Sequence, residues 1–316
     1  MQKTVKLMSS PDLFRQLELR HLLVLDAIAR EGSFWAAADA LDCSQSAISQ
    51  QVAALERAAG HRMVERSRGR REVTVTEVGR LLLVHAEAIV ARLRAAQADL
   101  AAYAEGAAGV LRVGSYQSVG QRIVPTLLRE FGASWPQVEV RLLEQNTDAA
   151  LLDAVERGEL DLAFGILPLT PGPFSCVELL RDPYLLVTPA SWSLGTGGRP
   201  PRLRDLRGRP FVANRCCHTV EHVDGFLRQH GIEPNVVFRS DDNGTVQAAV
   251  AAGLGAALVP RLSIDLADPG IRATRTPELP CRTLVLSWHR DRYRSPASLA
   301  FQDAALAVCA RLAEAA

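Results

Sequence analysis

The sequence lacks the patterns that many enzymes and membrane proteins carry. Its 316 residues contain no Gly-x-Ser-x-Gly elbow, no HExxH helix, no GxxxxGKS/T phosphate loop and no GxGxxG turn after a strand. Hydrolase, zinc-protease, P-loop and dinucleotide-binding chemistry therefore have no support. No apolar run of about 18 residues occurs, so no transmembrane helix is predicted. We expect a protein that is not an enzyme, uses no cofactor and does not enter a membrane.

The sequence contains six cysteines and nearly balanced charges. The six cysteines show no CxxC spacing, which is typical of reduced thiols in a cytosol. The residues before position 17 include Lys3 and Lys6 but no apolar core, so we expect a flexible tail and not a secretory signal. These features predict a cytoplasmic protein. Because the net charge is only +1, a prediction of nucleic-acid binding has to rest on a local cluster of basic residues.

Residues 33–57 have the pattern of two short helices joined by a tight turn. Ser33 and Ser44 stand where an N-cap serine accepts a hydrogen bond from an amide of the first turn. The second helix has an apolar face and a polar face at helical spacing. The apolar face comprises Ile48, Val52, Leu55 and Ala59, and the polar face comprises Ser46, Ser49, Gln50 and Ala53. Such short polar groups suit base edges, which predicts a helix-turn-helix in the major groove.

An ordinary helical hairpin with a solvated polar face would show the same pattern. The next residues argue against this alternative, because 66–71 read Arg-Ser-Arg-Gly-Arg-Arg between alternating β-formers. They predict a hairpin, or wing, whose cationic tip neutralises phosphates or enters a minor groove. The residues expected to contact DNA are Ser33, Ser44, Gln45, Ser46, Ser49, Gln50, Arg66, Arg68, Arg70 and Arg71.

The chain resembles the LysR-type transcriptional regulators over about residues 17–310. The matching segments are Leu19-Arg20-His21-Leu22, Glu31-Gly32-Ser33-Phe34, Ala36-Ala37, Ser44-Gln45, Ala47-Ile48-Ser49, Leu55-Glu56, Thr76-Glu77-Val78-Gly79, 158–163 and 251–260. Ser46 stands where the family usually has proline, which leaves base preference open. The resemblance implies an α/β fold class with an N-terminal winged helix-turn-helix, a long linker helix and a C-terminal effector-binding domain. That domain would have two α/β lobes, similar to periplasmic solute-binding proteins and joined by two crossing strands.

A long amphipathic helix is predicted over residues 78–105, where proline is absent and glycine occurs only at Gly79. Its apolar stripe comprises Leu82, Ala86, Ile89, Leu93, Ala96 and Leu100. Since the stripe lacks a partner in its own short domain, we expect it to pair with the same helix of another copy. Packing against its own chain is the alternative. A dimer or tetramer would also match a two-fold operator.

Strands alternate with helices beyond Gly106-Ala107-Ala108-Gly109, which we expect to act as a hinge. Strands at 110–114, 138–142 and 160–164 indicate a parallel sheet. One helix, through Leu127 and Phe131, is expected between the first two strands, and another, from about Asp148 to Arg157, between the second and third. Strand 184–187 is expected to cross to a second lobe, and strand 284–288 and helix 295–313 to return. The second lobe would hold strand 211–213, a helix at about 218–230 and the helix-to-strand run 245–259. The predicted domains are 17–76, 77–106 and 109–316, with lobe I at 109–186 and 271–316 and lobe II at 187–270.

Ligands of open α/β sheets bind beyond the carboxyl ends of the strands, near helix N-termini. The residues expected around such a site are Ser115, Tyr116, Gln117, Gln145, Asn146, Ile166, Asn214, His218, Asn243 and Thr245. Most are neutral hydrogen-bonding groups, and helix N-termini can hold an anionic group without a dedicated cation. The set predicts a small organic effector with a polar or anionic end, and no metal ion. Each residue could instead be a cap or a loop residue.

Cys216, Cys217, His218 and His222 form an ambiguous cluster. A thiol at a helix start has a stabilised thiolate, so peroxide sensing through Cys216 or Cys217 is one alternative function. The second cysteine that peroxide-sensing members of the family would place about nine residues on is absent. A soft-metal site is another alternative, although its ligands would bunch within 216–222. An alternative of another class is a solute-binding or enzymatic domain with an appended DNA-binding head.

The sequence as a whole predicts a transcriptional regulator that binds double-stranded operator DNA and responds to a small organic effector. Effector binding would change the pose of the lobes and, through the 78–105 helices, the spacing of the DNA-reading heads. The expected partners are operator DNA, the effector, further copies of the chain and, as a candidate, RNA polymerase. The sequence leaves the effector, the operator and the sign of regulation open.

Overall fold

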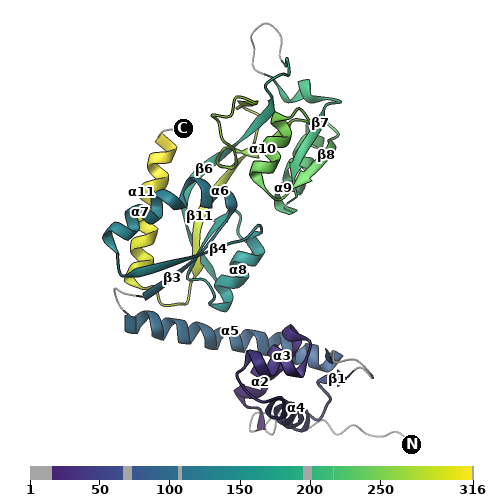
Figure 1. The fold of residues 1–316 in the computed structure, drawn as a ribbon, viewed down its shortest axis with the longest axis vertical. Helices are drawn as coiled ribbons and strands as arrows, with labels where there is room; N and C mark the ends of the chain where they lie inside the picture. Colours follow the sequence, from purple (N-terminus) through teal and green to yellow (C-terminus); the bar gives the residue numbers. More distant parts are fainter. Residues whose placement is uncertain (1–15, 67–72, 106–108, 195–200, 216, 315–316) are drawn as a thin grey trace, which may run out of the picture. The chain divides into compact units, whose positions relative to one another are not determined.

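The computed structural model describes residues 16–66, 73–105, 109–194, 201–215 and 217–314, and Figure 1 shows how their helices and strands are arranged. The chain forms two compact units, residues 1–97 and 98–316. Within the described residues, no helix combines the length and the apolar character that crossing a membrane requires.

The amino-terminal unit contains helices α2 (Leu19–Glu31), α3 (Phe34–Ala40) and α4 (Gln45–Ala59), followed by a hairpin. The hairpin pairs β1 (Val64–Arg66) with β2 (Val73–Val75) in antiparallel register. Both predicted caps are present: Ser33 Oγ accepts a hydrogen bond from Ala36 N–H at 3.1 Å, and Ser44 Oγ accepts one from Ala47 N–H at 3.2 Å. The structure thus confirms the predicted helix-turn-helix and the strands that follow it.

The core of this unit lies between α2, α3 and α4. Ile48 and Leu55 on α4 are fully buried and Val52 is 5% exposed. Ala59, the fourth residue of the predicted apolar face, is half-buried against the same cluster. The outer face of α4 thereby stays at the surface.

Helix α5 (Glu77–Glu105) is the long helix that the sequence predicts. Its stripe, however, has a partner inside the chain, because Leu82, Ala86 and Val90 of α5 pack with Leu22 of α2. The prediction that the stripe lacks a partner in its own domain is therefore wrong for its first half. The periodicity identified an apolar face correctly, but it could not say that α2 covers part of that face.

The carboxy-terminal unit is built on a mixed sheet of strand order β10-β6-β11-β5-β3-β4, to which β9 adds by pairing with β6. Strands β3 (Gly109–Ser115), β4 (Val138–Glu144) and β5 (Leu162–Ile166) are parallel, as predicted. Strand β11 (Cys281–His289) runs antiparallel to β5 and to β6 (Phe174–Pro189). The carboxyl ends of β3, β4 and β5 therefore meet at one edge of the sheet.

The helices of lobe I follow the predicted order with one difference. The single helix expected after β3 is divided into α6 (Gln117–Arg122) and α7 (Val124–Ser134). Pro125 explains the division, because proline lacks an N–H and is accommodated in the first turn of a helix. Helix α8 (Asp148–Arg157) has the predicted bounds, and α11 (Pro296–Glu314) packs against α7 and β6.

Lobe II contains β7 (Pro210–Asn214), α9 (Cys217–Gln229), β8 (Asn235–Ser240), α10 (Asn243–Ala251), β9 (Ala257–Pro260) and β10 (Ile271–Thr274). Short 3₁₀ turns lie at Leu203–Leu206 and Arg261–Ser263. Strand β6 belongs to both lobes, because residues 174–183 pair with β11 and residues 184–189 pair with β9 and β10. Strands β8 and β10 were not predicted from the sequence.

Candidate nucleic-acid interface and ligand cleft

The outer face of α4 carries the side chains that the sequence predicts for contact with DNA. Gln45, Ser46 and Gln50 are exposed, and Ser49 is half-buried. The Ser44 and Ser46 hydroxyl oxygens lie 2.8 Å apart at the helix N-terminus. Ser33 and Ser44 serve as caps, so their oxygens already accept backbone hydrogen bonds. This face presents hydrogen-bonding groups on a short rigid helix, which is the arrangement that major-groove reading requires.

The wing is described only in part. Its strands β1 and β2 pair as predicted, with Arg66 opposite Val73. The side chain of Arg66 and the residues Arg68, Arg70 and Arg71 lie outside the described residues. Their contact with DNA stays a prediction from the sequence.

A cleft opens between the lobes, beyond the carboxyl ends of β3, β4, β5 and β7. The sequence-predicted residues in its lining are Tyr116, Gln117, Gln145, Asn146, Ile166, Asn214 and Asn243. They come together because residues that follow neighbouring parallel strands emerge at the same sheet edge. Asn214 and Asn243 belong to lobe II, so both lobes contribute to the lining.

The remaining predicted residues are not in this lining. Ser115 is fully buried, and its hydroxyl donates to the carbonyl oxygen of Tyr116 at 3.1 Å. Thr245 is exposed in the first turn of α10, where its N–H donates to Asp242 Oδ1 at 2.6 Å. The side chain of His218 lies outside the described residues.

Ser118, which also follows strand β3, lines the cleft too. Sequence reasoning missed further lining residues, namely Asp148, Asp241, Val259, Pro260, Ser263 and Arg282. Arg282 changes the electrostatic description, because the cleft was expected to bind an anionic group without a dedicated cation. Its Nε donates to Asp182 Oδ2 at 2.8 Å and its Nη2 donates to Ser118 Oγ at 3.0 Å. Asp182 and Arg282 face each other across β6 and β11. Only the register of two strands far apart in sequence brings them together.

The Asp182–Arg282 pair is almost completely shielded from water. The side chains are 1% and 11% exposed, respectively. Burial raises the pKa of the Asp182 carboxyl above its usual value, while attraction to Arg282 and hydrogen bonds from Arg282 and Leu262 N–H oppose the rise. The pair lies where the strands pass between the lobes, and its Arg282 lines the cleft.

The described cysteines are free thiols. Cys43, Cys176 and Cys281 are exposed and Cys309 is buried, and none of them is in a disulfide. Burial raises the pKa of the Cys309 thiol to about 12, and partial burial also raises the pKa values of Cys176 and Cys281. The described residues include no group of three or more potential metal ligands. Cys216 and the side chains of Cys217 and His222 lie outside the described residues, so the thiol and metal alternatives stay untested.

Known proteins resemble the chain along most of its length. Uncharacterized HTH-type transcriptional regulator YcgK from Bacillus subtilis is 30% identical over 300 residues, covering 87% of this chain and 90% of its own. A probable hydrogen peroxide-inducible genes activator from Streptomyces viridosporus is 31% identical over 257 residues, or 80% of each chain. The crystal structure of full-length CbnR with its target DNA shares the fold at a TM-score of 0.63 and 24% identity, covering 92% of this chain and 100% of that one.

Two family descriptions match the chain directly. The LysR substrate binding domain matches residues 104–310. The bacterial regulatory helix-turn-helix protein, lysR family, matches residues 19–80. These matches agree with the helix-turn-helix of one unit and the two-lobed α/β architecture of the other. The chain therefore belongs to the LysR family of DNA-binding transcriptional regulators, with an N-terminal helix-turn-helix and a C-terminal effector-binding domain.

Proposed function

We propose that this regulator reads operator DNA with α4 and the β1–β2 wing, and that a small polar organic molecule bound in the interlobe cleft controls it. The observation that carries the second part is the lining of the cleft, in which hydrogen-bonding groups from both lobes converge. A molecule that contacts both walls would favour one relative pose of the lobes over another. We assign no catalytic activity to the chain and expect it to act in the cytoplasm.

The lining favours a ligand with several hydrogen-bonding groups. Gln145, Asn214 and Asn243 carry carboxamides, each of which can donate and accept hydrogen bonds. Arg282 adds a guanidinium whose Nε and Nη2 already donate to Asp182 and Ser118, and Asp148 and Asp241 add carboxylates to the lining. The predicted effector is therefore a small organic molecule with a polar or anionic end and additional hydrogen-bonding groups.

Filling the cleft should abolish the response to ligand without affecting DNA binding. Ile166 is half-buried at the end of β5 and lines the cleft, so Ile166→Trp would occupy space that a ligand needs. In a thermal-shift screen of small carboxylates and phosphates, a ligand at about 100 times its Kd would add about 2.7 kcal/mol to the stability of the wild type. The same compound should leave the melting temperature of Ile166→Trp unchanged.

Val237→Trp is the matched control, because Val237 is 52% exposed on β8 and is not in the lining. It should retain the full ligand-induced shift. A compound that stabilises Ile166→Trp as much as the wild type binds elsewhere, and this result would remove the cleft from the proposal.

Thiol-based sensing of peroxide is a second candidate function. It is favoured by the relative that is named as a probable hydrogen peroxide-inducible genes activator and by the position of Cys217, the residue after Cys216 in the sequence, at the start of α9. In this case peroxide alone would change the DNA footprint of the purified protein, and Cys216→Ser or Cys217→Ser would abolish the change. That result would replace the small-molecule proposal.

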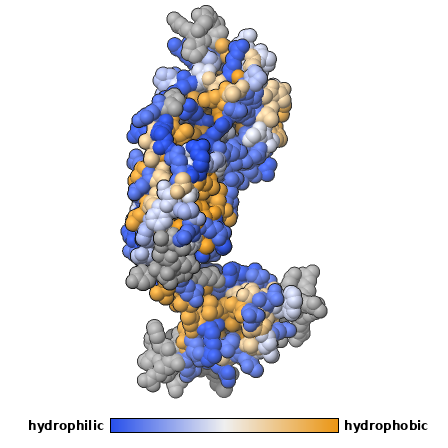
Figure 2. All heavy atoms as spheres, turned by 60° about the vertical axis from the view of Figure 1, so that its left-hand side comes forward, coloured by the Kyte–Doolittle hydropathy of each residue, from blue (hydrophilic) through white to orange (hydrophobic). Residues whose placement is uncertain are grey.

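We further propose the domain division 17–76, 77–106 and 109–316, with α5 joining two copies of the chain. Leu81, Val84 and Ile89 of α5 are 68%, 66% and 45% exposed, and Figure 2 shows apolar side chains gathered on the surface of the amino-terminal unit. Leu81 and Val84 lie away from Leu82, which α2 covers. Ile89 is an exposed member of the predicted stripe, seven residues after Leu82. Pairing of two such faces would bury them as in a coiled coil.

Charges on this face should separate the copies. The double substitution Leu81→Arg and Val84→Arg would place two cations in an apolar seam, where an unpaired charge is costly. We expect multi-angle light scattering to show a monomer with unchanged helix content. Glu87→Arg makes the same change in net charge at an exposed position of α5 that already carries a charge, and it should leave the assembly intact. An unchanged oligomer in the double variant would mean that this face is not the interface.

A further inference from the structure

The first residue of helix α6, Gln117, forms hydrogen bonds with lobe II. Gln117 follows β3 in lobe I, and its side chain reaches the N-terminus of α10 in lobe II. Its Nε2 donates to Asp242 Oδ2 at 2.5 Å, and its Oε1 accepts from Asn243 N–H at 2.8 Å. The carboxamide of Gln117 therefore uses both its donor and its acceptor across the lobe boundary.

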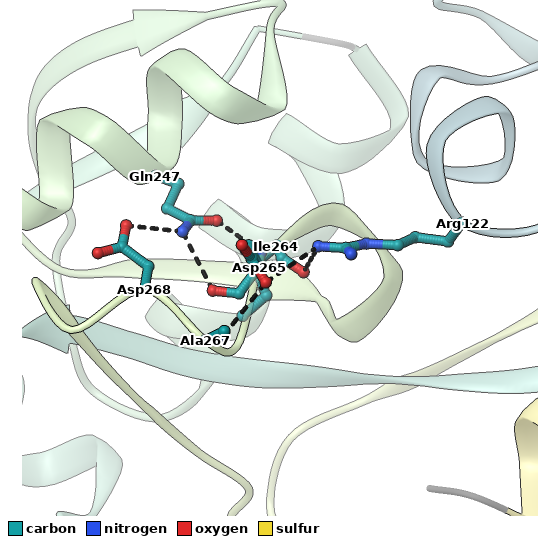
Figure 3. Close-up of polar contacts among 6 residues, drawn as sticks. All are labelled: Arg122, Gln247, Ile264, Asp265, Ala267 and Asp268. Carbon is teal, nitrogen blue, oxygen red and sulfur yellow. Dashed lines mark hydrogen bonds and ion pairs between the residues drawn. The ribbon is translucent and has the colours of Figure 1, made fainter.

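The last residue of α6 makes a second contact with lobe II. Arg122 Nη2 donates to the carbonyl oxygen of Ile264 at 2.6 Å and lies near Asp265, with an N–O separation of 3.7 Å. Figure 3 shows Arg122 approaching this loop from the side opposite Gln247. Gln247 is 9% exposed; its Oε1 accepts from Asp265 N–H at 2.7 Å, and its Nε2 donates to Asp268 Oδ2 at 2.8 Å. Arg122 thus binds a loop that lobe II already holds in place.

The two ends of α6 differ in their relation to the cleft. Gln117 lines the cleft and contacts Asp242, which is exposed. Arg122 is not in the lining. Next to Gln117, Ser118 Oγ accepts from Arg282 Nη2, which ties the second residue of α6 to the crossing strand β11. A molecule that enters the cleft therefore meets the Gln117 contacts, whereas the Arg122 contact lies outside its reach.

We propose that α6 is an interlobe latch, in which a ligand in the cleft displaces Gln117 from α10 while Arg122 remains bound as the pivot. Each contact at the Gln117 end is a partly exposed hydrogen bond, which a ligand group of matching polarity can replace. In the ligand-free protein the Gln117 carboxamide thus holds the hydrogen-bonding partners on lobe II that the effector would take over. The latch rests on the proposed cleft for its biological role, but its contacts exist without ligand and can be tested without one.

Amide hydrogen exchange at Asn243 reports the state of the latch. Asn243 is the first residue of α10, where a helix provides no internal acceptor for the N–H, and Gln117 Oε1 is its acceptor. In the ligand-free full-length protein, Gln117→Ala should accelerate this exchange about fivefold, the size expected for one ordinary hydrogen bond. Unchanged exchange would overturn the latch.

A second variant tests whether α6 acts as one device. Arg122→Ala should also accelerate exchange at Asn243, although Arg122 does not contact that residue, because loss of the pivot loosens the whole interlobe contact. Arg141→Ala is the control, since Arg141 pairs with Glu139 inside lobe I and should have no effect. If Arg122→Ala leaves Asn243 at the wild-type rate, the two ends are independent surface contacts and the latch is wrong.

Exchanging the carboxamide of Gln117 with the carboxylate of Asp242 provides a rescue experiment for the latch. Hydrogen bonds from Thr245 and Gln117 hold the pKa of Asp242 below its usual value, so this carboxyl is ionised at neutral pH. Gln117→Glu would set two carboxylates against each other and accelerate exchange more than Gln117→Ala does. Adding Asp242→Asn should restore slow exchange, because asparagine can donate to the new carboxylate and is still a good N-cap for α10. A double variant that exchanges as fast as Gln117→Glu would contradict the latch. The ligand screen with Ile166→Trp tests the cleft separately, so failure of the latch can be told apart from failure of the proposed ligand site.

Discussion

Replacing Asp182 with alanine is expected to destabilise the carboxy-terminal unit by about 3–5 kcal/mol, because it leaves a buried charge without its partner. The Arg282 guanidinium, which is 11% exposed in the wild type, would lose the carboxylate that faces it. Leu262 N–H, which donates to Asp182 Oδ1 at 3.1 Å, would also lose its acceptor. In a unit of this size the melting temperature should fall by roughly 6–20 °C, which differential scanning calorimetry can measure.

Two comparisons isolate the cause of this loss. Glu139→Ala removes an ion pair with Arg141 whose side chains are 59% and 61% exposed, and such surface pairs contribute about 0–1 kcal/mol. The double substitution Asp182→Leu and Arg282→Met removes both buried charges and should recover most of the stability. If Asp182→Ala costs no more than Glu139→Ala, the pair is not the buried ion pair described above.

The sequence predicted best the elements whose limits are set by neighbouring residues. Helix α8 has the predicted bounds because Thr147 caps its first turn and Gly158 ends it in the left-handed region at φ 81°. The start of α4 follows equally from Ser44 and from the spacing of Ile48, Val52 and Leu55. These signals are local, so they can be found without knowing the fold.

Features that depend on contacts between distant residues could not be predicted in the same way. The Asp182–Arg282 pair requires the register of β6 on β11, and no local pattern encodes that register. The stripe of α5 was identified by its period, but its burial depends on Leu22 from another helix. Period and composition describe a face, and only the tertiary structure says what covers it.

The same limit applies to predicting which individual residues line the cleft. Parallel strands predict that residues after β3 and β4 gather at one edge, which places Gln117 and Asn146 correctly. Successive residues of a strand, however, point to opposite sides. An error of one position in the predicted strand end therefore moves a residue from the cleft to the core, or the reverse. Ser115 is the last residue of β3 and is fully buried, whereas Tyr116 lines the cleft.

Converting the outer face of α4 to alanine should abolish sequence-specific DNA binding. The changes are Gln45→Ala, Ser46→Ala, Ser49→Ala and Gln50→Ala in one protein. A good contact with a base contributes about 1–3 kcal/mol of discrimination, and the gap between specific and non-specific binding is about 4–10 kcal/mol. Loss of several such contacts together can therefore close the whole gap, while the non-specific affinity that phosphate contacts provide remains.

This variant should stay folded, which makes the loss interpretable. None of the four side chains belongs to the core of the amino-terminal unit, and alanine favours helix more than glutamine or serine does. The Ser44 cap of α4 also remains. Circular dichroism should therefore show a helix content and a melting temperature close to those of the wild type.

The wing should give a different result. Replacing Arg68 or Arg70 with glutamine would remove a phosphate contact, so binding to all sequences should weaken by a similar factor. The slope of the logarithm of the affinity against the logarithm of salt concentration should become shallower by about one for each lost contact. Selectivity between sequences would change little if these arginines neutralise phosphates.

Both results can be measured on duplexes that the wild-type protein selects from a random library, with competition by unselected duplex at one fixed salt concentration. Gln97→Ala, at an exposed glutamine of α5, controls for loss of a surface carboxamide and should keep the wild-type preference. The α4 variant should bind selected and unselected duplexes equally. If it still protects the selected sequence in a footprint, then α4 is not the helix that reads the bases, and the assignment of Gln45, Ser46, Ser49 and Gln50 is wrong.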